Sequence, residues 1–349
     1  MKKIFALFLS LILVVGTVTA CGSGAKESTA TTATTATTAD TIVKTGLGVV
    51  LSIAKSTNAT DAAKGLAEVD AYAVAVLVGT DGKILACNID SSQAKINFDT
   101  TGQITTATGT VFKSKQELKT EYGLGAKSAI KKEWNEQANA FASYCVGKTL
   151  AEVKGIAVSA TGVATVADLT SSCTIGVTDF ISAIDKAVTN AQNLGAKSTE
   201  KLGIAVTTDM GKSANFSATA AGLAQGYSFY CAVTTDTTGK VTSCMIDASQ
   251  GNVNFDAKGT ITTDLTKAPQ PKQELKEAYG MKAKSGLGKE WYEEANSFAK
   301  YATGKTASDI KGIAVTADGK ATGTDVTSSV TISVAPLMLV VSNAVAAAK

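Results

Sequence analysis

The fold is decided by two apolar runs, Ala71-Tyr72-Ala73-Val74-Ala75-Val76-Leu77-Val78 and Ile84-Leu85-Ala86-Cys87-Asn88-Ile89-Asp90, joined by a turn that contains Thr80-Asp81-Gly82-Lys83. Apolar runs on either side of an Asp-Gly turn are typical of an antiparallel hairpin. The pattern returns later as Tyr227–Thr234, a turn that carries Gly239, and Val241–Asp247. Each half of the sequence therefore predicts its own antiparallel hairpin.

The two hairpins belong to an internal duplication. Cys244 follows Cys87 by 157 residues, and many other pairs share this offset. When residues 83–177 are aligned without gaps on residues 240–334, 51 of the 95 positions are identical. Identity at this level indicates duplication rather than convergence, and each copy is long enough to have its own core.

The segments that follow each hairpin predict the fold class. Ser114-Lys115-Gln116-Glu117 fits a capping box, in which Ser114 is the N-cap of a helix that ends at Tyr122-Gly123. One apolar stripe with helical spacing comes next, and a helix is expected at the end of each copy: the stripe is Ile130, Trp134, Ala138, Phe141 and Cys145, and the last helices are Asp179–Ala191 and Leu337–Ala348. We expect an α+β protein of two tandem duplicated domains, each an antiparallel sheet with packed helices.

Two stretches between the hairpin and the helices are harder to assign. Asn97-Phe98-Asp99 and its counterpart Asn254-Phe255-Asp256 predict an irregular polar segment, and Gly102–Thr106 predicts a further short strand. Asp90 and Glu133 recur at matched places in both copies. Each of these acidic residues is explained equally well as a ligand holder, a turn residue or a helix cap.

The N-terminus has the pattern of a secretory leader. Lys2-Lys3 precede an apolar run from Ile4 to Val15, and Val18-Thr19-Ala20-Cys21 follows. This last segment resembles the bacterial lipobox, which implies that Cys21 is lipidated and anchors the protein to the extracytoplasmic face of the cell membrane. The alternative is an ordinary secretory signal in which Cys21 stands by chance.

These patterns together predict the organisation of the chain. Residues after the lipobox are mostly Thr, Ala and Ser, which cannot bury enough apolar surface to order themselves. The expected segments are a lipoprotein signal peptide at 1–20, a tether at 21–42, the first domain at 43–192, a linker at 193–199 and the second domain at 200–349.

The composition excludes several kinds of site. The chain has no His, and all 33 of its basic residues are Lys, so histidine ligands and arginine clamps are ruled out. A net charge of +3 gives no field that would steer the protein onto nucleic acid. No Cys-x-x-Cys motif occurs, and we expect no metal site. Cys231 and Cys244 lie at equal distances from their hairpin turn, so they are either disulfide-bonded or two buried thiols.

A polar heptad lies near the end of each copy. The first heptad reads Asp168-Leu169-Thr170-Ser171-Ser172-Cys173-Thr174, and the second heptad reads Asp325-Val326-Thr327-Ser328-Ser329-Val330-Thr331. Hydroxyls and free backbone N–H groups just before a helix can hold an anion without arginine.

The heptads resemble the motif Asp-x-x-Ser/Thr-Gly-Ala-Thr/Ser of bacterial FMN-binding domains, which occur in extracytoplasmic flavin subunits and in surface flavin lipoproteins of Gram-positive bacteria. The helices before them resemble those of clostridial lipoproteins of the same group. In that family the last Thr or Ser carries FMN through a phosphoester bond. The resemblance implies cofactor-binding roles for six residues, with Thr174 and Thr331 as attachment points: Asp168, Ser171, Thr174, Asp325, Ser328 and Thr331. Ser172 and Ser329 replace the family's Gly, which makes the motif degenerate.

The sequence leaves two functions open. The first is a membrane-anchored lipoprotein with two FMN-binding-like domains that carry flavin for extracytoplasmic electron transfer to an unidentified redox partner. The second is a non-catalytic surface binding module for a small molecule, a wall component or a protein, whose doubled domain raises avidity. An electron carrier or a binding module is favoured over a turnover enzyme, because no nucleophile and base are paired in the sequence.

Overall fold

The structure is a computed structural model that describes residues 41–349, so the predicted signal peptide, Cys21 and nearly all of the predicted tether lie outside the described residues. The first copy contains, in chain order, β1 (Lys44–Ser52), β2 (Gly65–Val78), β3 (Ile84–Phe98), β4 (Val111–Phe112), α1 (Lys115–Leu118), η1 (Lys119–Tyr122), α2 (Trp134–Cys145), α3 (Leu150–Lys154), α4 (Ala167–Thr170) and α5 (Thr178–Thr189). The second copy contains β5 (Lys201–Asp209), β6 (Gly222–Thr235), β7 (Val241–Phe255), α6 (Lys272–Leu275), η2 (Lys276–Tyr279), η3 (Lys282–Lys284), α7 (Trp291–Ala302), α8 (Ala307–Lys311), α9 (Thr324–Thr327) and α10 (Ala335–Ala346). The α+β class is confirmed.

Both sheets are antiparallel, and they differ by one strand. The first has the order β1-β2-β3, and the second has the order β4-β5-β6-β7. Strand β4 comes from the first copy and crosses to pair with β5 of the second copy, where Val111 lies opposite Asp209. The counterpart of Phe112 in the second copy is Pro269, whose nitrogen has no hydrogen to donate to a neighbouring strand. The exchange of this strand is therefore one-sided.

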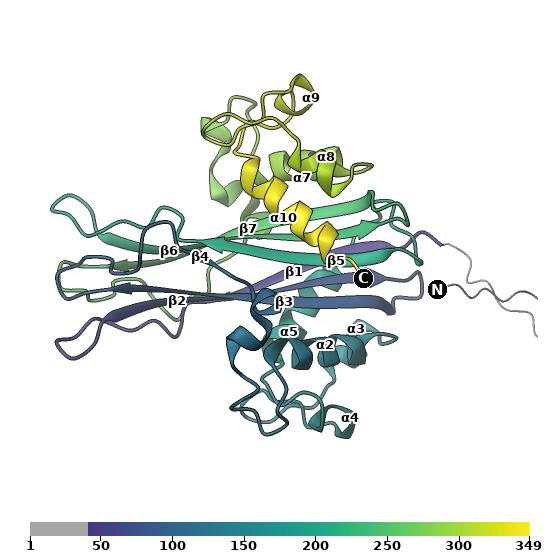
Figure 1. Cartoon of the computed structure of the whole chain (residues 1–349), viewed down its shortest axis with the longest axis horizontal. Coiled ribbons are helices and arrows are strands. Elements are labelled where there is room, and N and C mark those ends of the chain that lie inside the picture. The colour runs from purple at the N-terminus through teal and green to yellow at the C-terminus, as the bar shows by residue number, and fades with distance from the viewer. Residues whose placement is uncertain (1–40) are drawn as a thin grey trace, which may run out of the picture. The chain divides into compact units, whose positions relative to one another are not determined.

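The two sheets face each other, and the helices cover their outer sides (Figure 1). Helix α5 packs on β1 and β2, and α10 packs in the same way on β5 and β6. Each helical layer has its own apolar core against its sheet. Between the sheets lies a third core to which both copies contribute, formed by Leu47, Leu77, Leu202, Ile204 and Tyr230 among others. Residues 41–349 thus lie within one compact unit.

Reciprocal hydrogen bonds relate the copies by an approximate two-fold axis. The backbone N–H of Ile104 donates to Oδ1 of Asn215 over 2.8 Å. Its counterpart Ile261 donates to Oδ1 of Asn58 over the same distance. Each copy therefore caps a loop of the other, as the subunits of an isologous dimer do.

The strands are longer than the sequence predicted, and the prediction of an irregular segment around Asn97 was wrong. Strand β3 continues to Phe98, where residues 97 and 98 pair with Leu66 and Gly65. The polar residues that obscured it, Asp90 to Ser92, are buried inside the strand. Gly102–Thr106 is no strand, because only Ile104 forms an isolated bridge.

The helix predictions were more accurate. The Ser114 side chain accepts from the backbone N–H of Glu117, and the capping box is complete. Gly123 ends η1 with φ 73°, a conformation that favours glycine. The predicted stripe begins too early, because α2 starts at Trp134 and Ile130 precedes it. Among residues 41–349, no helix is both long and apolar enough to cross a membrane.

Candidate functional site

Each heptad contains a short helix and its C-cap. Asp168 lies within the short helix α4, and Ser171 is its C-cap. Asp325 lies within α9 in the same way, and Ser328 is the C-cap there. The Asp325 carboxylate accepts a hydrogen bond from the Tyr301 hydroxyl over 2.8 Å. These polar side chains therefore end or flank a helical turn instead of lining a cavity.

The last residue of the second heptad is bound by a buried carboxylate. Glu294 of α7 is fully buried. Its Oε2 accepts from the backbone N–H groups of Thr331 (2.6 Å) and Ile332 (3.0 Å). Its Oε1 accepts from the hydroxyls of Ser285 (2.7 Å) and Thr331 (3.1 Å). Glu294 thus occupies the donors that a phosphate at Thr331 would use.

The first heptad uses an amide in the same place. Gln137, the counterpart of Glu294, is also fully buried. Its Oε1 accepts from the backbone N–H of Thr174 over 2.8 Å and from the Thr174 hydroxyl over 3.1 Å. Its amide nitrogen donates to the Ser128 hydroxyl and to the Lys132 carbonyl. In both copies the heptad is fastened to the preceding long helix by one buried side chain.

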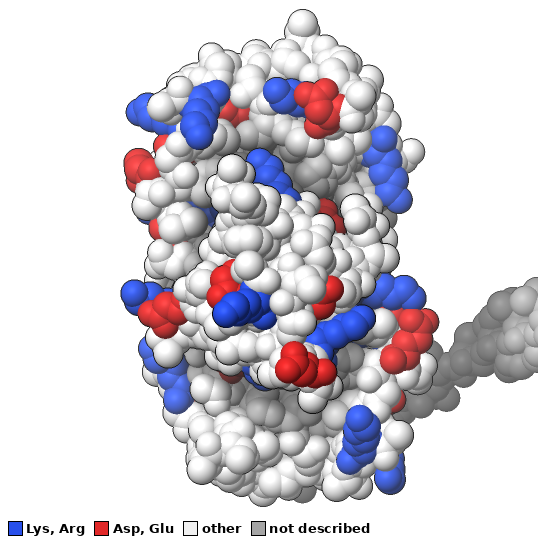
Figure 2. Space-filling view, turned by 90° about the vertical axis from the view of Figure 1, so that its left-hand side faces the viewer, with Lys and Arg blue, Asp and Glu red and all other residues white. Residues whose placement is uncertain are grey.

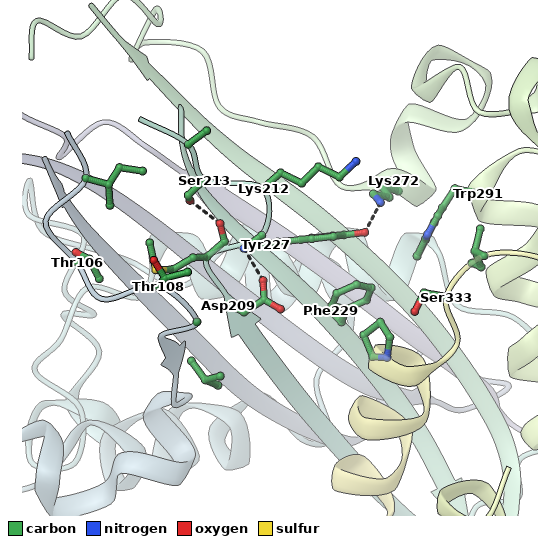
Figure 3. Close-up of a pocket in the computed structure, with 18 of the residues that line it drawn as sticks. Thr106, Thr108, Asp209, Lys212, Ser213, Tyr227, Phe229, Lys272, Trp291 and Ser333 are labelled. Carbon is green, nitrogen blue, oxygen red and sulfur yellow. Dashed lines mark hydrogen bonds between the residues drawn. The ribbon is translucent and has the colours of Figure 1, made fainter. Parts of the chain in front are cut away.

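A cavity of about 940 Å³ lies beside the second heptad. Both copies contribute to its wall: residues 104–111 come from the first, and the β5–β6 loop, β6, α6 and α7 come from the second. Ile332 and Ser333, which directly follow the heptad, also line it, as does Phe229; Figure 3 labels Ser333 and Phe229. The volume lies in the range of small-molecule sites.

Lys272 forms the inner end of this cavity within a cage of aromatic rings. Its side chain is only 2% exposed. The ammonium lies 4.6, 4.4 and 4.8 Å from the ring centroids of Tyr227, Tyr279 and Trp291. It also donates to the Tyr227 hydroxyl over 2.6 Å (Figure 3). Ring faces attract a cation, and this partly offsets the loss of water.

Burial changes the proton affinity of this lysine and of a nearby carboxyl. Desolvation lowers the pKa of Lys272 to about 7, although the charge of Asp247 opposes the shift. Desolvation raises the pKa of Asp247 to about 7, although its hydrogen bonds from the backbone N–H groups of Gln273 and Ala248 oppose it. Both groups therefore titrate near neutral pH, where a site can exchange protons with a ligand.

The first copy has the same caged lysine. Lys115 is 4% exposed and lies 5.0 and 5.2 Å from the rings of Tyr122 and Trp134. Tyr72 supplies the third ring, at 5.6 Å, and desolvation lowers the Lys115 pKa to about 8. Sequence reasoning missed both lysines because Lys115 was interpreted only as part of a capping box. The available signal was that the lysine, Tyr122 and Trp134 all recur in the second copy.

The five described cysteines are free and buried. Cys231 and Cys244 are not directly opposed, because Cys231 pairs with Ile246 and Cys244 pairs with Val233. Their sulfur atoms nevertheless lie 3.8 Å apart on one face of the sheet. Within residues 41–349 no group of three or more Cys, Asp or Glu side chains is arranged to hold a metal ion.

Charge is mixed on one face of the molecule. Figure 2 shows this face, on which lysines and acidic residues are interspersed.

The chain was compared with known proteins by family, by sequence and by structure. No family model, no curated protein and no solved structure matches it.

Proposed function

We propose that this protein is the binding module of a surface lipoprotein, and that it captures a small molecule in the cavity of the second copy. The observation that carries this proposal is the position of Lys272, whose charged end closes the aromatic inner wall of a cavity of about 940 Å³. Small-molecule sites typically have an apolar wall and a few polar groups that orient the ligand.

Several features support binding over catalysis. The rings of Tyr227, Tyr279 and Trp291 are packed around the lysine and are ready to contact a ligand without rearrangement. The lysine hydrogen-bonds to a tyrosine whose own pKa is raised, first by burial, so this hydroxyl stays protonated near neutral pH and supplies no phenolate base. The site is therefore arranged to hold a ligand rather than to activate a nucleophile.

A cavity-blocking variant tests this function. Ala214 lines the cavity, and its counterpart Thr57 occupies the same place in the first copy. We expect the purified protein to bind the neutral dye N-phenyl-1-naphthylamine with a rise in fluorescence. Ala214→Trp should abolish this rise, whereas Thr57→Trp should leave it intact. A dye signal that is absent, or equal in both variants, would refute the cavity as a binding site.

Flavin attachment is the second candidate, and one observation favours it: the residues after Thr331 line the cavity, so a flavin attached there could place its ring system against the aromatic wall. Glu294 opposes it, because a carboxylate repels a phosphate from the same donors. Expression with a flavin transferase, followed by intact-mass measurement, decides between them. An added FMN mass that disappears in Thr174→Ala plus Thr331→Ala supports attachment. An unmodified mass, in the wild type and in Glu294→Gln, excludes it.

The membrane anchor at Cys21 remains a proposal drawn from the sequence. A labelled fatty acid fed to the expressing cells should be incorporated into the wild-type protein. Cys21→Ser should lose the label and release the protein from the membrane fraction. Label retained by Cys21→Ser would refute this anchor without affecting the cavity.

A further inference from the structure

We propose that the ligand of this cavity is an anion with an aromatic body, whose charged group lies between Lys212 and Lys272. This inference rests on the proposed function and deepens it by naming the ligand class. The same positions in the first copy show how the protein neutralises the corresponding charges without a ligand.

In the first copy the counterpart of Lys212 is neutralised by the protein itself. Lys55 forms an ion pair of 2.7 Å with Asp70 and one of 3.5 Å with Glu68. Lys95 pairs with the other oxygen of Glu68 at 3.5 Å. Gln93 donates to both carboxylates. Lys55 and Lys95 are thus paired with two carboxylates of the protein, and the charge of Asp70 also favours the protonated form of Lys115.

The second copy has lost the acidic half of this network. Gln225 stands at the position of Glu68, Tyr227 at that of Asp70, and Asn252 at that of Lys95. Gln225 now donates to Asn252 over 2.8 Å, which forms a neutral amide pair. Lys212 alone keeps its charge, and within residues 41–349 its ammonium has no carboxylate within ion-pair distance.

The unpaired charge of Lys212 lies beside the cavity. Lys212 lines the cavity, and Figure 3 shows its side chain extending along Tyr227 toward Lys272. The two ammonium groups are close enough for the charge of Lys212 to oppose protonation of Lys272, after the larger effect of burial. An anion between them would relieve this repulsion and take the place of the missing carboxylates.

The other charged groups around the cavity do not fill this role. Asp209 lines the cavity, but its Oδ1 accepts from the backbone N–H of Gly211 over 2.6 Å. Asp247 lies behind Lys272, and its Oδ1 accepts from the N–H groups of Ala248 and Gln273. Both carboxylates accept from backbone N–H groups and, in the part of the chain that the structure describes, form no ion pair with either lysine, although the charge of Asp247 favours the protonated form of Lys272.

The rest of the wall defines the body of the ligand. Tyr227, Phe229, Tyr279 and Trp291 face the cavity together with Met210 and Met281. Aromatic and thioether side chains favour a flat apolar ligand. A carboxylate or phosphate group on an aromatic ring system combines this body with the required charge, since two lysines can donate to its oxygens.

A matched pair of probes isolates the charge. We expect calorimetry at low salt to show that naphthalene-2-carboxylate binds at least tenfold more tightly than naphthalene-2-carboxamide, which has the same skeleton without the charge. Lys212→Gln should abolish this preference, because the exposed lysine can be changed without disturbing the core. Lys55→Gln, at the same place in the first copy, should preserve it.

A second variant approaches the question from the opposite side. Gln225→Glu restores to the second copy the carboxylate that Glu68 supplies in the first, and it should lower the affinity for the naphthoate at least tenfold while the carboxamide binds as before. Equal binding of the two probes by the wild type would overturn the anion class and leave the binding function standing. Failure of both probes and of the neutral dye would overturn the binding function itself.

Discussion

The phenyl rings of Phe98 and Phe255 stack parallel to each other, with their centroids 4.3 Å apart. The two residues hold the same position in the two copies, so the stack lies where the approximate two-fold axis passes between the sheets. Both rings are fully buried, and each lies against the backbone of a glycine on the neighbouring strand, Gly65 for Phe98 and Gly222 for Phe255. A side chain at either glycine would collide with the ring.

The stacked pair should couple the stability of the two copies. We expect Phe98→Ala and Phe255→Ala each to lower the free energy of unfolding by about 3–5 kcal/mol, because each leaves a cavity in the apolar cluster to which both rings belong, together with Val69, Met210 and Val253. The double variant should lose less than the sum, by about 0.5–1.5 kcal/mol, since the ring–ring contact can be lost only once. Urea unfolding followed by circular dichroism gives the free energy of unfolding of the wild type, the two single variants and the double variant. Strict additivity would show that the rings do not interact.

The reciprocal loop caps should affect stability equally and ligand binding unequally. Asn58→Ala and Asn215→Ala each remove the acceptor of one backbone N–H, at a cost of about 1 kcal/mol. Asn215 lines the cavity and binds Ile104 in its wall, whereas Asn58 does not line it. The midpoint of thermal unfolding should therefore fall by a similar amount in both variants. Only Asn215→Ala should weaken binding of the neutral dye. Equal weakening would indicate that the effect passes through the whole fold.

Removal of the caged lysine should change the pH dependence of stability. The pKa of Lys272 is lowered to about 7 in the folded protein from 10.5. Between these values the unfolded chain binds more protons, so the unfolding free energy rises with pH across this window, and the cost of burying the charge is fully present below pH 7. The free energy of unfolding of Lys272→Met should therefore exceed that of the wild type most at pH 6, where the difference should be a few kcal/mol larger than at pH 10.

Lys115→Met is the matched control for this prediction. Its pKa is lowered less, to about 8, so the variant should show the same sign with a smaller change. The measurement is urea unfolding of the wild type and both variants between pH 6 and pH 10. A stability difference that does not vary with pH would show that Lys272 is not titrating in the folded state.

The paired thiols of the second copy should be slow to react until the protein unfolds. Burial raises the pKa of Cys231 well above its usual value, so little thiolate is present. The native protein should resist both a thiol reagent and a mild oxidant, whereas refolding under oxidising conditions should link Cys231 to Cys244 and reduce the mass by two hydrogens. Cys231→Ser is the control, and its failure to change the outcome would assign the oxidation to other cysteines.

Local sequence patterns predicted the α+β class, because each pattern identifies a single helix, strand or turn. The Asp-Gly turn, the Ser114 capping box and the last helices were all visible as spacing and capping signals. The polar end of β3 was not, because Ser91 and Ser92 read as a loop in the sequence. Their burial depends on the facing sheet, for example through the bond from the Thr208 hydroxyl to Ser92.

The candidate site was less predictable because it depends on contacts between copies. The sequence predicted a site at the heptads. In the structure, the threonines that end them donate hydrogen bonds to the buried side chains of Gln137 and Glu294. The cavity needs a segment of the first copy, residues 104–111, against the second. No local pattern predicts such a contact. The sequence signal of the site was the recurrence of Lys115, Tyr122 and Trp134 as Lys272, Tyr279 and Trp291.

The reciprocal caps at Asn58 and Asn215 have a consequence for how the two sites can differ. In a dimer of identical chains every substitution appears twice, so a change that opens one pocket opens both. Covalent fusion removes this constraint, because each half is encoded separately. The chain can keep Asp70 in one half and place Tyr227 in the other, which gives it a self-neutralised half and a half with a free cation within a single symmetric frame.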